Sequence, residues 1–174
     1  PTYDVFDEDR YFASNQDIKV MPFKDEILGV SICEDMWNVN EAALKKHYRI
    51  DPIAVLAEQG ATLLINLSAS PFNVGKDKVR HDIIKNHIQK YHLPFIFVNQ
   101  IGGNDELIFD GKSMAFDKKA KLIDALPAFK EQVKTIDLQR KKRKDFITEN
   151  EIASVHKALV LGLKDYLHKI GFKK

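Results

Sequence analysis

Three apolar, β-type runs separated by helical stretches constrain the fold of this 174-residue chain more than any other feature. The runs lie at 26–33, 62–67 and 95–99, and the segments between them predict helices at 51–60 and 77–91. Strands that alternate with helices are typical of parallel strands joined by right-handed crossovers. The uninterrupted apolar character of the middle run indicates a buried strand. We therefore predict an α/β fold.

The two predicted helices have recognisable signals of their own. Asp51 followed by Pro52 is typical of an N-cap and a first helical position, and Gly60 is placed to end that helix. In the second helix, apolar side chains and His87 recur on one face at helical spacing. We expect His87 to be a packed core residue rather than a metal ligand or the partner of a catalytic cysteine, because no histidine has a supporting ligand at metal spacing.

The chain changes character after Gly102-Gly103, a pair that we expect to end a strand before a loop. Short β-type runs then alternate with turn residues such as Asp110-Gly111. Asp-Gly between apolar runs favours a hairpin connection. We predict a meander of strands near 106–109, 112–117, 121–125 and 132–137.

The C-terminal part contains the only run of like charges and a capped helix. The basic residues 140–144 lack interleaved aromatic residues, so we interpret them as a solvated linker rather than a nucleic-acid contact. Thr148 to Glu151 forms a capping-box pattern that opens an amphipathic helix ending at Gly171. Its apolar positions are Ile152, Val155, Leu159, Leu163, Tyr166, Leu167 and Ile170. We expect this face to pack against a further domain.

Composition excludes several classes of protein. The net charge is +2, from 27 basic and 25 acidic residues, which does not point to nucleic acid. The sequence contains no apolar stretch near the roughly 20 residues of a membrane helix. A single cysteine excludes an intrachain disulfide framework and favours a cytoplasmic protein. Pro1 begins inside what resembles a continuing segment, so we expect a piece of a longer protein.

That single cysteine, Cys33, is the strongest candidate for chemistry. It ends the first β-type run, and α/β sheets bind ligands at the carboxyl ends of their strands. A nucleophilic cysteine needs a base or a cation nearby to become a thiolate. The adjacent Glu34 and Asp35 oppose thiolate formation by their charge. Activating groups must therefore come from elsewhere, and an inert buried cysteine is the alternative at this point.

Four ordered segments resemble a known family. Cys33-Glu34-Asp35-Met36-Trp37 after an apolar strand resembles the nucleophile segment of the nitrilase superfamily. Residues 1–12, 66–72 and 158–166 are similar to the glutamine-dependent NAD+ synthetase family. That family joins a glutaminase domain to an ATP-dependent synthetase domain. The resemblance implies the C-terminal part of a nitrilase-type four-layer α-β-β-α sandwich, followed by one extra helix.

The resemblance also implies a domain division and a function. Residues 1–139 would be a partial nitrilase-like glutaminase (CN-hydrolase) domain, 140–147 a basic linker, and 148–174 the first helix of the synthetase domain. The complete enzyme would be a carbon-nitrogen ligase that converts deamido-NAD+ to NAD+ with ATP and ammonia from glutamine. ATP and Mg²⁺ are implied for the synthetase domain, and no cofactor or metal for these residues. The family also implies a homo-oligomer.

Site residues carry over by position in the motifs. Cys33 would attack the glutamine carboxamide, while Tyr3, Glu34, Ser70 and Lys76 would hold the α-amino and α-carboxylate groups of glutamine. The family's glutamate base and oxyanion lysine would precede Pro1, so the stretch by itself is expected to be inactive. Two alternatives stay open: a nitrilase-type amidase for a different amide, and a non-catalytic assembly module.

Overall fold

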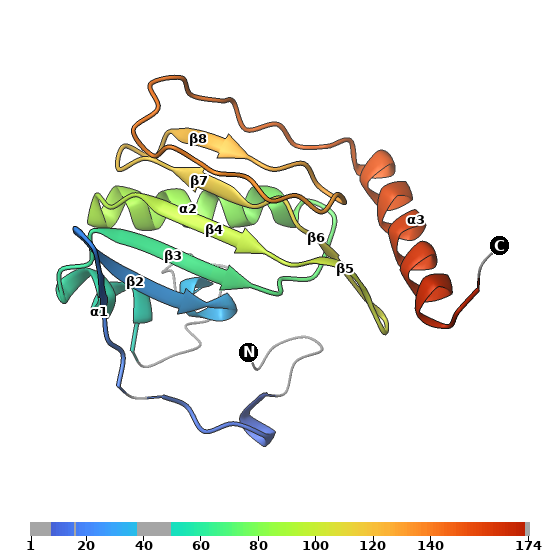
Figure 1. Cartoon of the computed structure of the whole chain (residues 1–174), viewed down its shortest axis with the longest axis horizontal. Helices are drawn as coiled ribbons and strands as arrows, with labels where there is room; N and C mark the ends of the chain where they lie inside the picture. The colour runs from blue at the N-terminus through green and yellow to red at the C-terminus, as the bar shows by residue number, and fades with distance from the viewer. Residues whose placement is uncertain (1–7, 16, 38–49, 173–174) are drawn as a thin grey trace.

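A six-stranded sheet forms the centre of the computed structural model, which describes residues 8–15, 17–37 and 50–172. Its strand order is β1-β2-β3-β4-β7-β8, and β2, β3 and β4 are parallel (Figure 1). Antiparallel strands extend it on both sides. The predicted parallel α/β core is confirmed. The strands are β1 (Met21–Phe23), β2 (Glu26–Ile32), β3 (Leu63–Ser68), β4 (Phe95–Asn99), β7 (Met114–Phe116) and β8 (Leu122–Ala125).

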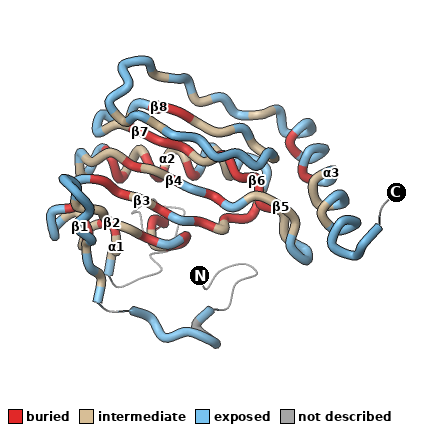
Figure 2. Tube along the Cα trace, in the orientation of Figure 1, coloured by how far each residue is buried: buried red, intermediate tan, exposed pale blue. Residues whose placement is uncertain are grey.

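Helices α1 (Pro52–Glu58) and α2 (Lys76–Tyr91) pack on one face of this sheet and enclose the core (Figures 1 and 2). The Asp51 side chain caps α1 by accepting hydrogen bonds from the Ile53 and Ala54 amides, as predicted. Fully buried side chains from both helices meet the sheet. The largest apolar ones are Ile53, Leu56, Leu64, Ile83, Ile84, Ile88, Phe95, Phe97 and Phe116.

His87 belongs to this core, as the sequence predicts. Its ring is 2% exposed, and Nε2 lies 2.6 Å from the Met36 carbonyl oxygen. Nε2 therefore carries the hydrogen, because a carbonyl only accepts. Burial lowers the pKa of His87, and the hydrogen bond to Met36 offsets part of that effect. The histidine is a neutral structural group that joins α2 to the segment after β2.

The opposite face of the parallel strands is aliphatic and more open. Alternate residues point to it, and registered neighbours such as Val30 with Ile65 and Leu67 with Val98 lie side by side. Ile32, Leu67 and Val98 are 66%, 47% and 43% exposed. The three strands are therefore apolar on both faces, although α1 and α2 cover only one.

A separate hairpin corrects the predicted meander. Strands β5 (Ile101–Asn104) and β6 (Leu107–Asp110) form a two-stranded sheet and, within the described part of the chain, pair with no other strand. Gly102-Gly103 therefore lies inside a strand and does not end one. Strands β6 and β7 belong to different sheets, so Asp110-Gly111 connects sheets and does not form a hairpin turn. Residues 132–137 form no strand. Val133 is 98% exposed, so that run has no packing surface to make it a strand.

Residues 127–147, called the strap below, cross beside β7 and β8 and then reach the C-terminal helix (Figure 1). The strap includes the basic run, whose side chains are anchored by ion pairs. Arg143 pairs with Asp117, and Lys144 and Arg140 pair with Asp124. Lys134 also pairs with Asp124. The expected solvated linker is thus held against the edge of the sheet.

Helix α3 (Glu151–Lys169) projects along the β5–β6 hairpin (Figure 1). Its N-cap is Asn150, which accepts a hydrogen bond from the Ala153 amide, so the predicted Thr148 capping box is wrong. The helix meets the hairpin through small and polar residues, with Ser154 and Ala158 buried. The apolar positions that we expect to pack against a further domain are exposed here, Ile152 at 82% and Leu163 at 61%, and that packing stays a prediction. One short 3₁₀ turn (Glu8–Arg10) precedes β1.

Candidate functional site

Cys33 lies at the carboxyl end of β2, where the chain turns into a 3₁₀ helix, η2 (Cys33–Trp37). Its φ is 46°, in the left-handed region that non-glycine residues seldom adopt. The Asp35 carboxylate accepts a 2.7 Å hydrogen bond from the Ile32 amide and closes the turn. Strained backbone of this kind persists only where the surroundings hold it, and it is common at functional sites.

A chain of buried polar side chains supports this turn from β3. Ser68 Oγ donates to Asn66 Oδ1 at 2.6 Å, and Asn66 Nδ2 donates to Ser31 Oγ at 3.0 Å. Asn66 Nδ2 also lies 3.4 Å from the Cys33 carbonyl oxygen. Each amide or hydroxyl thereby has a partner, which buried polar groups require. The carboxyl ends of β2 and β3 are locked together around Cys33.

The thiol itself is buried, at 5% exposure. Burial raises the pKa of Cys33, because a thiolate is poorly solvated there. The Ala69 backbone amide and the Ser68 hydroxyl act in the opposite direction and lower the pKa of the thiol. Burial dominates, so Cys33 is a neutral thiol in this arrangement. A nucleophilic role requires a further base or cation next to it.

The structure brings three of the four predicted glutamine-binding residues to the same sheet edge. Glu34 follows Cys33 and is 2% exposed. Ser70 lies in the loop after β3, and Lys76 is the first residue of α2. The Lys76 ammonium is 5.6 Å from the centre of the Trp37 ring, at the end of η2. Tyr3 lies outside the described residues.

Ser70 is completely buried and held by groups that the sequence analysis did not identify. The Arg80 Nε donates to Ser70 Oγ at 3.1 Å, and the Asn99 Oδ1 accepts from the Ser70 amide at 2.9 Å. Arg80 also pairs with Asp110 through both carboxylate oxygens, each at 2.9 Å. One signal could have revealed Arg80. It precedes Ile84 and His87 by four and seven residues, which places an arginine on the apolar face of α2.

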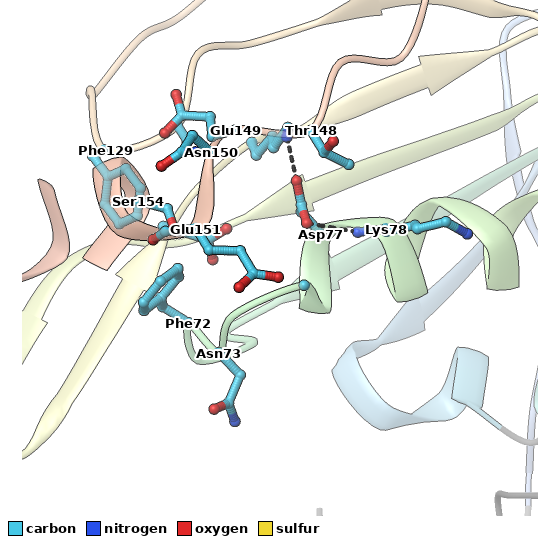
Figure 3. A pocket seen from close by; sticks show the side chains of 14 residues that line it. Phe72, Asn73, Asp77, Lys78, Phe129, Thr148, Glu149, Asn150, Glu151 and Ser154 are labelled. Carbon is cyan, nitrogen blue, oxygen red and sulfur yellow. Dashed lines mark hydrogen bonds and ion pairs between the residues drawn. The ribbon is translucent and has the colours of Figure 1, made fainter. Parts of the chain in front are cut away.

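A cavity of about 350 Å³ lies between the loop before α2, the strap and the start of α3. Phe72 and Phe129 lie on one side of it and Asp77 on the other (Figure 3). The Asp77 carboxylate pairs with Lys112, which also donates to the Ile147 carbonyl oxygen. Among the described residues that line this cavity there is neither Cys33 nor Lys76. It is therefore separate from the candidate nucleophile.

The described residues also bear on metal binding and on membrane crossing. Within residues 8–15, 17–37 and 50–172, no group of three or more His, Cys, Asp or Glu side chains could hold a metal ion. No described helix is long and apolar enough to cross a membrane.

One known family covers most of this chain. The model of the carbon-nitrogen hydrolase family matches residues 1–147. The chain belongs to this family. The match ends near the close of the strap, before the residues of α3.

Curated relatives narrow the family further. The chain is 42% identical over 182 residues to a glutamine-dependent NAD+ synthetase of Synechocystis, with 100% of this chain and 32% of that protein covered. A glutamine-dependent NAD+ synthetase of Thermotoga maritima is 32% identical over 212 residues, with 100% of this chain and 35% of that protein covered. The chain therefore spans about a third of the length of the curated relatives it matches.

Solved structures support the fold. The glutamine-dependent NAD+ synthetase of Acinetobacter baumannii superposes with a TM-score of 0.82 at 27% identity, over 98% of this chain and 31% of that one. A carbon-nitrogen hydrolase of Helicobacter pylori gives a TM-score of 0.61 at 22% identity, over 75% and 47% of the two chains. The second likeness bears on the fold alone. The nitrilase-type α/β architecture inferred from the sequence is confirmed.

Proposed function

We propose that this chain is the nucleophile-bearing part of the glutaminase in a glutamine-dependent NAD+ synthetase. The observation that carries the proposal is the strained Cys33 at the end of β2, with Glu34, Ser70 and Lys76 at the same sheet edge. The similarity of relatives along the whole chain supports it. No glycine-rich phosphate loop occurs in the 174 residues, so the proposed role is the release of ammonia and not the ATP-dependent step.

In the proposed reaction, the Cys33 sulfur attacks the side-chain carboxamide carbon of glutamine. The C–N bond then breaks, ammonia leaves, and a γ-glutamyl thioester remains on Cys33. Water cleaves the thioester to glutamate and restores the thiol. The thiol proton must reach the leaving nitrogen, which requires a base next to Cys33. The glutamate base and oxyanion lysine implied by the resemblance would supply these groups from sequence other than the residues here.

The neighbours of Cys33 have separate proposed roles. The buried Glu34 carboxylate suits the α-ammonium group of glutamine, and the Lys76 ammonium suits the α-carboxylate. Because Lys76 is the first residue of α2, the free amides of that helix end add to the attraction for an anion. Ser70 accepts from Arg80, so its own hydroxyl hydrogen stays available for another acceptor. Tyr3 completes the proposed set.

The remaining parts of the proposal concern the complete protein. Ammonia would pass to a synthetase domain that uses ATP and Mg²⁺ to convert deamido-NAD+ to NAD+, with residues 148–174 as the first helix of that domain. We propose a cytoplasmic enzyme, because the single cysteine needs no oxidising compartment. Exposed apolar side chains on the open sheet face and on α3 support a homo-oligomer.

A Cys33→Ala variant of the complete protein tests the proposal. NAD+ formation from glutamine should be lost, whereas NAD+ formation from free ammonium salts should persist, because the two reactions use separate sites. Asp35→Asn serves as a control for disturbance of the same turn and should retain the Cys33 thiol. Equal loss of both activities in folded Cys33→Ala protein, or glutamine-driven synthesis without Cys33, would refute the assignment. Hydrolysis of a different amide in preference to glutamine would favour the alternative amidase.

A further inference from the structure

The Arg80 guanidinium has all of its hydrogen-bonding capacity engaged inside the protein. The side chain is 1% exposed, and its Nη1 lies 2.9 Å from both carboxylate oxygens of Asp110. Nη2 donates to the Ser70 and Pro71 carbonyl oxygens, each at 3.0 Å, and Nε donates to Ser70 Oγ at 3.1 Å. Asp110, the last residue of β6, is 4% exposed. The pair is therefore almost completely removed from solvent, and every N–H donor of the guanidinium is bonded.

Fold stability by itself does not explain such a pair. Burial of two charges costs much of what their attraction returns, and well-packed apolar residues of similar size are often as stable. The planar guanidinium instead gives fixed directions to five donors, which an apolar side chain cannot provide. Here three of these five contacts go to one loop segment, Ser70-Pro71. The geometry points to control of the position of that loop.

Asn99 holds the same segment from the other side. Its Oδ1 accepts from the Ser70 amide at 2.9 Å, and its Nδ2 lies 3.3 Å from the Ser70 carbonyl oxygen and 3.0 Å from the Gly111 carbonyl oxygen. Ser70 thus has its amide, its carbonyl and its hydroxyl all bonded to buried side chains. The backbone at this point has no freedom to shift without the loss of several hydrogen bonds.

The two residues before Ser70 are those that act on the candidate nucleophile. Ser68 follows Leu67, the register partner of Ile32, so it lies beside Cys33 where β3 and β2 end. The Ser68 hydroxyl donates to Asn66 Oδ1, and Asn66 Nδ2 lies 3.4 Å from the Cys33 carbonyl oxygen. The Ala69 amide, next along the chain, favours the Cys33 thiolate. We propose that Arg80 and Asp110 are positioning residues that hold the start of the β3–α2 loop, and with it the Ala69 amide, beside Cys33. This inference rests on the proposed function, because it assigns the pair to the reactivity of Cys33.

Two conservative variants of the complete protein test the inference. Arg80→Lys keeps the positive charge but loses the planar guanidinium with its five donors. Asp110→Asn keeps the shape of the side chain but loses the negative charge of the carboxylate. The matched control is Arg143→Lys, which changes another Arg–Asp pair, with Asp117, at the strap. The readouts are the rate of Cys33 alkylation by iodoacetamide against pH, with the Cys33 peptide followed by mass spectrometry, and kcat and KM for glutamine. Thermal unfolding is measured in parallel.

Both variants should alkylate more slowly at neutral pH, with the rate profile displaced to higher pH, because the Ala69 amide is no longer held beside the thiolate. The kcat/KM for glutamine should fall about 10- to 100-fold, mainly through kcat, since small displacements of reacting groups are costly. NAD+ formation from ammonium should be unchanged. The control should match the wild type in all of these.

The direction in which the rate of Cys33 alkylation changes distinguishes a positioning role of the pair from a purely structural one. A purely structural pair would leave a looser protein whose buried thiol reacts faster, and that result would overturn the inference. Wild-type alkylation and kcat/KM together with a lowered unfolding temperature would overturn it as well. If the wild-type protein does not use glutamine, the proposed function fails, while the alkylation comparison still decides whether Arg80 positions the loop.

Discussion

Helices α2 and α3 are both amphipathic, but α2 packs through its apolar face and α3 packs through a face of small and polar residues. Helix α2 turns Ile83, Ile84 and Ile88 into the core, where each is at most 1% exposed. Helix α3 packs on the hairpin through Ser154, Ala158 and Gly162, and most of its apolar stripe remains in solvent (Figure 2). Helical periodicity therefore predicts that a helix forms without predicting which face it buries.

The α3 contact depends on close backbone approach and on charge. A side chain at Gly103 would bring its Cβ to 3.2 Å from the Gly162 Cα, and one at Gly162 would bring its Cβ to 2.9 Å from Ile108 Cδ1, so both positions favour glycine. Asp165 Oδ2 accepts from the Gly103 amide at 2.8 Å, and Lys169 Nζ donates to the Gly103 carbonyl oxygen at 2.6 Å. The strap is likewise held by ion pairs. Ion pairs and close backbone contacts thus contribute much of the packing of residues 127–172, together with Phe129 on Phe72 and Phe146 on the core, whereas apolar burial dominates between the sheet and helices α1 and α2.

The largest expected difference between the two helices is in core truncation. Ile84→Ala should lower the free energy of unfolding by about 2–5 kcal/mol, because it removes buried methyl groups and leaves a cavity. Leu163→Ala on the exposed stripe of α3 should change it by less than about 0.5 kcal/mol. Urea unfolding of both variants measures the difference. Similar losses for the two would mean that the α3 stripe is buried in solution.

Gly103→Ala should separate α3 from the hairpin. The added methyl group meets backbone of α3, which gives way less readily than a side chain, so we expect a cost of about 1–3 kcal/mol. Hydrogen exchange should rise along α3 and in β5, while α2 keeps its protection. Leu163→Ala serves again as the control. Unchanged exchange in α3 would contradict the close backbone contact.

Asp124 makes the anchoring of the strap sensitive to pH. Burial raises the pKa of Asp124, but hydrogen bonds and ion pairs with Lys134 and Lys144 outweigh it and lower the pKa from 3.8 to about 2. Stability from this group is present above pH 3.8 and is lost as the pH falls through 2. Because the lysines are partly exposed, we expect the Asp124 ion pairs to contribute about 1–2 kcal/mol to the free energy of unfolding, which is less than the pKa shift alone would give.

The test compares Asp124→Asn with the wild type across this range. The difference in unfolding free energy should be constant near neutral pH and should shrink as the pH falls from about 4 to 2. Added salt should also reduce it, since part of the attraction is screened. The effect of Ile84→Ala should not depend on salt. A pH-independent Asp124→Asn difference would show that its ion pairs do not form.

The smallest expected effect concerns a single charged hydrogen bond. Asp165→Asn weakens the acceptor of the Gly103 amide and should cost about 0.5–1.5 kcal/mol. Lys164→Ala on the neighbouring exposed position is the matched control and should be close to neutral. Exchange of the Gly103 amide, followed by NMR, is the most direct measurement. Equal exchange in both variants would contradict the Asp165 contact.

The sequence alone determined the local elements of this protein. Asp51 and Pro52 begin α1, and the three apolar runs form parallel strands, with Cys33 at the end of the first run. These features are predictable because helix caps, periodicity and strand ends depend on residues that are neighbours in the chain. The family also followed from short ordered motifs. The candidate roles of Glu34, Ser70 and Lys76 stay predictions.

Only the tertiary structure decided how distant residues meet. It placed Gly102-Gly103 within β5, where they pair with Phe109 and Ile108 of β6, and it turned the basic run toward Asp117 and Asp124. It also joined Arg80 to Asp110, 30 residues further along the chain. The physical reason is that the sequence gives the chemical type of each side chain but not the distant residue that it contacts. That contact depends on long-range packing, which brings opposite charges or two glycine backbones together.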